Sequence, residues 1–257
     1  MKIMMLILFA GILSIGCIYS TMTKNDLTKA HLNGKVKSIR EICYKAIYKD
    51  GVIIKGERQK RANMEAESFT LYDEKGNQTE YSIFRPDGSL QIKFISSYDY
   101  RGYKTTNNSY DSQGNLNTKT IYKYDDGGNE IEVNMYASDG SLYLKTTFKN
   151  DGNGNKTEEI WFTADGSLLS KDIYKYDGLG NKTEQSSYDD GILDTRYTYK
   201  VDENGNDIER NGYDASGNLV SKNIYQYEYD KKRNWIKRID FENDIPQLFI
   251  EREIEYY

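Results

Sequence analysis

Segments rich in Tyr, Thr, Ile and Lys recur along most of this chain, and short polar turns that contain glycine separate them. The segment SLLSKDIYKY at 167–176 is representative, because it directly follows Asp165-Gly166 and ends just before Asp177. Short runs of β-branched and aromatic residues between Gly, Asn and Asp are typical of strands joined by tight turns. The pattern therefore predicts an all-β chain whose successive strands pair antiparallel.

The turns recur with a fixed period. One set of glycines stands at positions 76, 102, 128, 154, 180 and 205, and a second set at 88, 114, 140, 166, 191 and 217. Neighbours within a set are 26 residues apart, with a single shorter interval of 25 in each set. A constant period indicates a repeat architecture, in which each unit contacts chiefly the units before and after it. The array covers roughly residues 69–241.

The turn residues predict the turn types. Asp at the first position, Gly at the fourth and Asn after it favour a type I turn closed by a left-handed glycine. Asp190-Gly191, where one residue of the repeat is missing, predicts a two-residue hairpin, as does Asp50-Gly51. Two strands per unit and the flanking hairpins give an antiparallel meander of about 14–16 strands.

Turn geometry also predicts which residues share a face. It places Phe162 opposite Leu168, and Glu158 opposite Asp172. The resulting concave or covered face holds Tyr122, Tyr124, Tyr136, Leu142, Leu144, Phe148, Ile160, Phe162, Leu168, Tyr174, Tyr176 and Tyr188. The other, wet face holds Lys123, Lys145, Lys149, Lys171 and Lys175, interspersed with Val133, Trp161 and Ile173.

The same pairing slips by about one residue per strand, the stagger that gives a (β/α)₈ barrel its ~36° tilt. We therefore expect a single curved sheet that is barrel-like or, as the alternative, an open twisted sheet. A barrel of so many strands would be too wide for side chains to fill, so its interior would be wet.

The composition indicates a protein with a thin, partly hydrated interior and not one with a thick, dry hydrophobic core. The chain has 257 residues, of which 24 are Tyr, and its mean hydropathy is −0.80. A tyrosine carries an apolar ring and a hydroxyl that needs a partner, so it suits a half-exposed layer. The net charge of −5, with acids and bases interspersed, argues against a nucleic-acid partner, which would require a basic face.

The first 17 residues, MKIMMLILFAGILSIGC, contain an apolar run that suits the core of a signal peptide and is short for a membrane span. The run ends in Gly16-Cys17 and resembles a bacterial lipoprotein signal, although Ser14 stands where that family usually has Leu. The resemblance implies cleavage before Cys17 and lipidation of that cysteine at a membrane of the cell envelope. Ordinary secretion and a retained anchor are the alternatives. Residues 18–34 are expected to form a polar tether, and 35–257 a single β-repeat domain.

The recurring YDxxGN and DGxL segments, with Tyr-rich strands between them, resemble the YD repeats of rearrangement-hot-spot proteins at bacterial surfaces and in toxin delivery. The repeat period here is longer than is usual for that family. The resemblance implies a β-meander at the cell surface, which in this family is often described as carbohydrate-binding.

Catalytic chemistry is not indicated. Cys43 is expected to be a small strand residue, and the only histidine, His31, falls in the tether. A recurring glutamate is expected to form a ladder with neighbouring Lys or Tyr, since a catalytic site would be singular; its members are Glu80, Glu132, Glu158, Glu184 and Glu209. The Asp- and Asn-rich turns begin like calcium loops but lack the Gly and Glu that an EF-hand requires. We expect no enzyme activity, cofactor or metal.

The residues that could stack on a sugar or another flat ligand are Trp161, Tyr174, Tyr176, Tyr188 and Trp235, and packing of the sheet is the alternative reading of this set. We expect a lipid-anchored binding module that presents a Tyr-rich sheet to a glycan or a protein. The alternative is a structural or scaffold protein, in a toxin or immunity setting, without a small ligand. A membrane-spanning β-barrel is disfavoured because each Lys at the bilayer midplane would cost roughly 2–4 kcal/mol.

Overall fold

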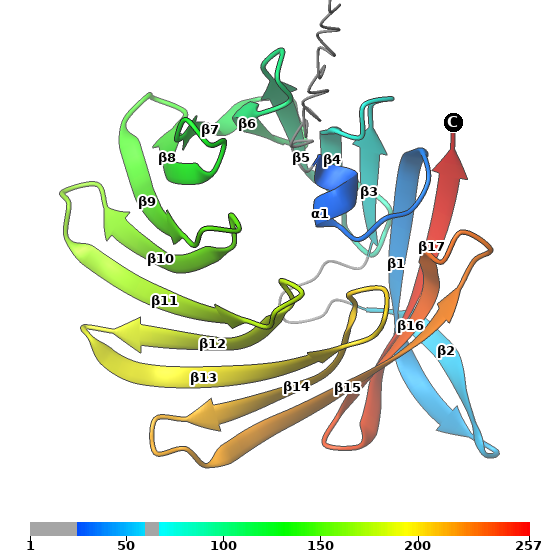
Figure 1. The fold of residues 1–257 in the computed structure, drawn as a ribbon. Helices are drawn as coiled ribbons and strands as arrows, with labels where there is room; N and C mark the ends of the chain where they lie inside the picture. The colour runs from blue at the N-terminus through cyan, green and yellow to red at the C-terminus, as the bar shows by residue number, and fades with distance from the viewer. Residues whose placement is uncertain (1–24, 60–66) are drawn as a thin grey trace, which may run out of the picture.

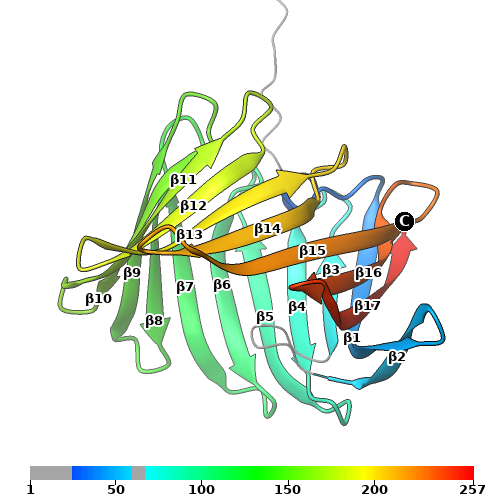
Figure 2. The same ribbon diagram turned by 90° about the horizontal axis from the view of Figure 1, so that it is seen from below.

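The computed structural model describes residues 25–59 and 67–257. These residues form one antiparallel sheet of 17 strands, of which 16 close into a barrel (Figures 1 and 2). The prediction of an all-β meander is therefore confirmed, and so is the prediction that its sheet curves. The leader peptide and Cys17 lie outside the described residues.

One short helix precedes the strands, α1 (Asp26–Lys29). The strands are β1 (Val36–Lys49), β2 (Val52–Arg58), β3 (Glu67–Tyr72), β4 (Gln78–Phe84), β5 (Leu90–Tyr98), β6 (Lys104–Asp111), β7 (Leu116–Tyr124), β8 (Glu130–Ala137), β9 (Leu142–Asn150), β10 (Lys156–Thr163), β11 (Leu168–Tyr176), β12 (Lys182–Asp189), β13 (Ile192–Val201), β14 (Asp207–Asp214), β15 (Leu219–Tyr229), β16 (Trp235–Glu242) and β17 (Ile245–Tyr256).

The barrel closes through β1. From β3 to β17 each strand pairs with the next one in the sequence. The first half of β1 lies between β3 and β17, with Ile39 opposite Thr70 on one side and Ile254 on the other. The second half of β1 pairs with β2 and forms a hairpin that extends the wall (Figure 2).

The turns have the predicted chemistry. In the turn at 151–155, the amide of Gly154 donates to the carbonyl of Asp151, and Gly154 has a φ of +79°. The Asp151 carboxylate accepts from the amides of Asn153 and Asn155, so these side chains hold their own turn. Asp190 and Gly191 both have positive φ, as a two-residue hairpin requires.

The predicted faces are only partly correct. Phe162 does pair with Leu168, but Glu158 pairs with Ile173 instead of Asp172. A β-bulge between Trp161 and Phe162 inserts one residue, and such an insertion moves the following side chains to the opposite face. The bulges place Tyr136, Ile160, Phe162 and Tyr188 on the outer face with the lysines, and Val133 and Trp161 on the inner face.

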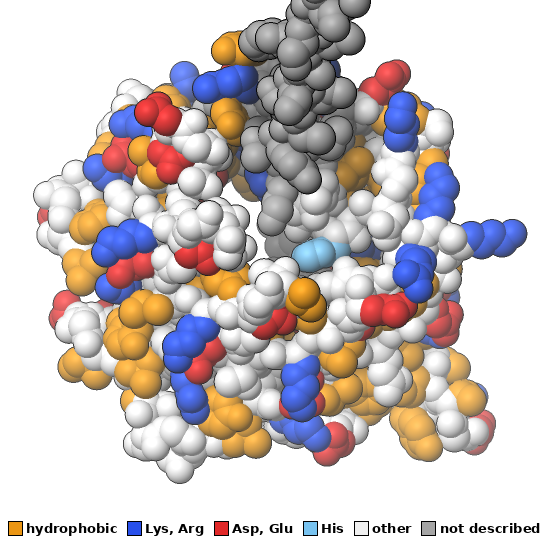
Figure 3. Space-filling model, viewed as in Figure 1, with side chains coloured by type: hydrophobic (Ala, Val, Ile, Leu, Met, Phe, Trp, Pro, Cys, Tyr) orange, Lys and Arg blue, Asp and Glu red, His pale blue; other side chains and the backbone are white. Residues whose placement is uncertain are grey.

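The outer face carries a ladder of ion pairs built from the recurring glutamates, as predicted. Glu132 contacts a lysine on each flanking strand, because it lies 2.6 Å from Lys123 and 2.9 Å from Lys145. Glu158 and Glu184 are bridged in the same way, while Glu80 and Glu209 each contact one lysine. Figure 3 shows the resulting mixture of acidic and basic side chains over the visible surface.

The inner face carries a second ladder, made by tyrosine hydroxyls. Tyr124 donates to the backbone carbonyl of Lys104, Tyr176 to that of Lys156, and Tyr227 to that of Asp207. Each bond joins two neighbouring strands, β6 to β7, β10 to β11 and β14 to β15, so it ties the wall together on its inner side without a dry core. This ladder is a structural reason for the high tyrosine content.

Apolar burial is confined to one side of the barrel. One cluster joins Leu27 of α1 to Val36, Ile39 and Tyr72, and the other joins Cys43, Trp235, Leu248 and Ile250. The segment 25–34, part of the predicted polar tether, lies across one opening of the barrel (Figure 1). It is held there because Asp26 accepts hydrogen bonds from Tyr98 and the Gln78 amide, and because Leu27 is buried.

Candidate functional site

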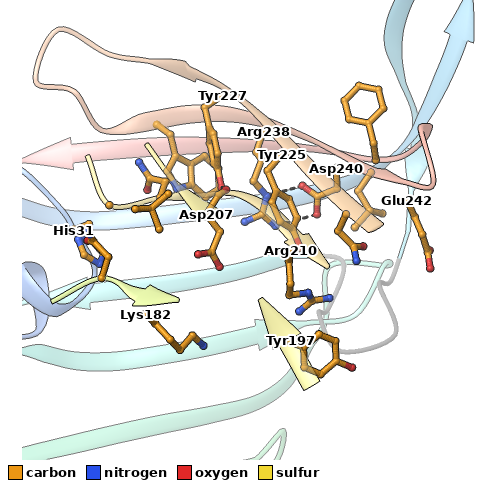
Figure 4. Close-up of a pocket in the computed structure, with 18 of the residues that line it drawn as sticks. His31, Lys182, Tyr197, Asp207, Arg210, Tyr225, Tyr227, Arg238, Asp240 and Glu242 are labelled. Carbon is orange, nitrogen blue, oxygen red and sulfur yellow. Dashed lines mark hydrogen bonds and ion pairs between the residues drawn. The ribbon is translucent and has the colours of Figure 1, made fainter. Parts of the chain in front are cut away.

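A cavity of about 980 Å³ lies on the inner face of the barrel, beside β12 to β17. Tyr197, Tyr225, Tyr227 and Trp235 supply aromatic walls, and Lys182, Asp207, Arg210 and Arg238 supply charges (Figure 4). His31, from the segment across the opening, lies at one end. A concave site with aromatic walls and a few polar groups is the usual form of a small-molecule site.

The cavity forms where the repeat departs from its own pattern. Gly212 occupies the position that Trp161 has two units earlier, and Val201 occupies the position of Tyr176 in the hydroxyl ladder. A Cβ at Gly212 would overlap the Ser221 hydroxyl and lie 2.9 Å from the Tyr197 ring. Because Gly212 has no side chain, the Tyr197 ring can lie close to the backbone there. Val201 is smaller than the tyrosine of the equivalent position, and it leaves more space in the cavity.

Two of the cavity's arginines are neutralised by carboxylates. Arg238 forms an ion pair at 2.7 Å with Asp240, which lies two residues further along β16. Arg252 contacts Glu41 at 2.8 Å and stacks on Trp235, with 3.3 Å between the guanidinium carbon and the ring centroid. These pairs help to hold the aromatic wall in place, since Trp235 is buried and both guanidinium groups contact its ring.

Four other charged groups line the cavity without such partners among the described residues: Arg210, Lys182, Asp207 and the exposed Glu242. Arg210 lies 5.2 Å above the Tyr197 ring, and its Nε is buried without a hydrogen bond. Within residues 25–59 and 67–257, Lys182 donates only to Gln185, at 3.3 Å, and it lies over the Tyr199 ring at 4.1 Å. Burial raises the pKa of Asp207 and lowers that of Lys182, while the attraction between the two opposes both shifts.

The predicted stacking residues are divided by the structure. Tyr176 and Trp235 line the cavity. Trp161 and Tyr174 are also on the inner face but outside the cavity lining, and the Tyr174 hydroxyl donates to Glu159 at 2.8 Å. Tyr188 lies on the outer face, opposite Lys171. Cys43 is a buried strand residue, and Cys17 lies outside the described part of the chain.

Sequence reasoning missed the charged residues of the cavity. Arg210 stands where other units have Val133, Glu159 or Gln185, and Gly212 stands where they have larger side chains. A comparison of the units position by position would have found both, because the repeat makes each departure visible. Lys182 would have remained hidden, since Lys104 and Lys156 occupy the same position in other units.

Solved structures with a similar fold include a porin-like protein from Bacteroides uniformis, with a TM-score of 0.55 and 12% identity over 87% of this chain and 98% of its own. A porin-like protein from Bacteroides vulgatus aligns with a TM-score of 0.36 and 13% identity, over 87% of this chain and 99% of its own. The Tc holotoxin pore of Photorhabdus luminescens aligns with a TM-score of 0.29 and 14% identity, over 71% of this chain and 11% of its own. No family model and no curated protein matches the chain.

These observations define a class by fold: a closed antiparallel β-meander barrel with a polar, aromatic cavity inside. The Bacteroides uniformis protein shares that fold. The resemblance to YD repeats stays a prediction based on the turn and strand residues. Among the described residues, no helix has the length and apolar character to cross a bilayer.

Proposed function

We propose that this protein is an envelope-located binding protein whose barrel interior takes up a saccharide. The observation that carries the proposal is the cavity itself, where tyrosine and tryptophan faces stand beside Arg210, Lys182 and Asp207. Sugar rings present apolar faces to aromatic side chains and hydroxyls to charged ones, so this lining suits them. The ligand-bearing surface is then the interior of the sheet, in place of an open Tyr-rich face.

The exposed charges of the outer face support the proposal that water, and not lipid, surrounds the barrel. Lys123, Lys149 and Lys175 are more than half exposed on it. Placing a lysine at a bilayer midplane costs roughly 2–4 kcal/mol, and the ladder would place several there. Membrane attachment would therefore depend on lipid at Cys17, which mass spectrometry of the mature N-terminus tests directly.

A saccharide array tests the binding proposal, followed by calorimetry with the best probe. Tyr197→Ala removes an aromatic wall of the cavity, and Tyr188→Ala removes an outer-face tyrosine as the matched control. We expect about tenfold weaker binding for Tyr197→Ala, which corresponds to ~1.4 kcal/mol, and wild-type binding for Tyr188→Ala. The absence of saturable binding across the array would refute the proposed function.

A further inference from the structure

Three of the unpaired groups of the cavity carry information about the charge of its ligand. Arg238 and Asp240 form one neutral pair, and Arg252 and Glu41 form another. Arg210, Lys182 and Asp207 remain on β12 and β14 with a combined charge of one positive unit, and the exposed Glu242 of β16 stands apart from them at the end of the lining opposite His31 (Figure 4). Because Arg210, Lys182 and Asp207 are half-buried, solvent only partly compensates this charge.

We propose that Arg210 and Lys182 bind a carboxylate of the ligand, so that the saccharide is a hexuronic acid or a glycan that contains one. This inference rests on the proposed function. A planar guanidinium matches a carboxylate with two parallel hydrogen bonds, and a lysine adds a point charge beside it. The buried Nε of Arg210 is one of the two donors that such a fork uses.

The charge count favours a carboxylate over a phosphate group. A carboxylate carries one negative charge, which balances the excess of one positive charge. A phosphomonoester carries about two negative charges at neutral pH, and the second would stand unbalanced near Asp207. Asp207 instead serves as an acceptor for the ligand's hydroxyls, since among the described residues no hydrogen bond reaches its carboxylate, and Tyr227 donates to its backbone carbonyl.

Departures from the repeat explain why Arg210 has this surrounding and the corresponding residues of the two preceding units do not. Arg210 is flanked by Gly212, which leaves the ligand room above the backbone, and it stacks against Tyr197. At the corresponding place two units earlier, Glu159 is occupied by a hydrogen bond from Tyr174, and Trp161 fills the space of Gly212. One unit earlier, Gln185 is held by Lys182 and by Tyr199.

The experiment compares three sets of probes on the whole mature protein: uronic acid oligosaccharides of several linkages, the same oligosaccharides with carboxyl groups reduced to alcohols, and sugar phosphates. We expect binding to uronic acid oligosaccharides that weakens at least tenfold after reduction. Arg210→Gln should weaken it by a similar factor, and Arg210→Lys by less. Arg196→Gln is the matched control, because Arg196 lies on the outer face beside Glu184.

The outcomes separate the two proposals. Equal binding of the acidic and reduced oligosaccharides, unaffected by Arg210→Gln, would overturn the carboxylate inference and leave saccharide binding intact. Tighter binding of the sugar phosphates would also overturn it. No binding of any saccharide would refute the proposed function itself. Circular dichroism and thermal melts confirm the fold of each variant, and Lys182→Gln gives a second test should Arg210→Gln not fold.

Discussion

The ion-pair ladder on the outer wall predicts that the folded state loses stability at acidic pH. The substitution Glu132→Gln measures the part of this loss that comes from Glu132. The Glu132 carboxylate accepts from Lys123 at 2.6 Å and from Asn134 at 2.7 Å, and it contacts Lys145 at 2.9 Å. These partners, Lys123 first, lower the pKa of Glu132 to about 2. A glutamate with a depressed pKa stabilises the folded state above its unfolded pKa, and this stabilisation is lost as the pH falls towards 2.

The magnitude follows from the size of that shift. Each pKa unit corresponds to about 1.36 kcal/mol, so the full shift from 4.5 would give an upper bound of about 3 kcal/mol. Lys123 and Lys145 are 57% and 41% exposed, so solvent screening reduces the contribution. We expect Glu132→Gln to lower the free energy of unfolding by about 1 kcal/mol at pH 7.

Urea denaturation between pH 2 and pH 7 is the assay, with Glu74→Gln as the control on an exposed turn residue. The difference between wild type and Glu132→Gln should shrink as the pH falls from about 4.5 to about 2, because the unfolded chain takes up the proton at Glu132 first and the folded protein takes it up only near pH 2. A difference that stays constant down to pH 2, or no difference at pH 7, would contradict the assigned role of the ladder.

Three further substitutions test other parts of the wall, each by chemical denaturation. Tyr176→Phe removes the 2.7 Å bond to the Lys156 carbonyl and should cost about 1 kcal/mol, whereas Tyr143→Phe, on an exposed residue, should be neutral; equal stability of the two variants would remove the hydroxyl ladder as a stabilising element. Gly128→Ala places a Cβ at φ +84° and against the Tyr103 hydroxyl, so it should cost at least ~1–2 kcal/mol, while Gly152→Ala meets nothing within 4 Å; a neutral Gly128→Ala would contradict the turn geometry. Trp235→Ala empties the buried position between Arg238 and Arg252 and should cost about 3–5 kcal/mol, and a loss below ~1 kcal/mol would show that the cluster around it contributes little.

The order of the strands could be predicted from the sequence because the turns are local. Asp151, Gly154 and Asn155 determine their own turn through contacts within five residues, so the same letters give the same geometry in every unit. The faces were harder, since a single bulge beside Phe162 reverses the inside and the outside. Whether the sheet closes depends on pairing between β1 and β17, for which a repeat pattern carries no signal.

The candidate site was the least predictable part. Trp235 and Tyr176 were among the candidates for stacking on a ligand, with packing of the sheet as the other reading, and both line the cavity. From the sequence alone, Arg210 and Lys182 resemble the charged residues of the solvent-exposed face, because the β-bulges decide to which face they point. Their significance comes from the absence of a neighbouring carboxylate in pairing distance, among the described residues, which only coordinates reveal.

The pairing of β1 with β17 has a consequence for how the polypeptide is made. Cys43 must wait for its neighbour Ile250, which a ribosome adds some two hundred residues later. Until then the growing sheet has two exposed edges, and each presents unpaired backbone groups to any other strand nearby. A chain truncated before Phe249 would keep its repeats but would lack most of the β17 residues that pair with β1. Such a truncation should therefore yield aggregates and not smaller barrels.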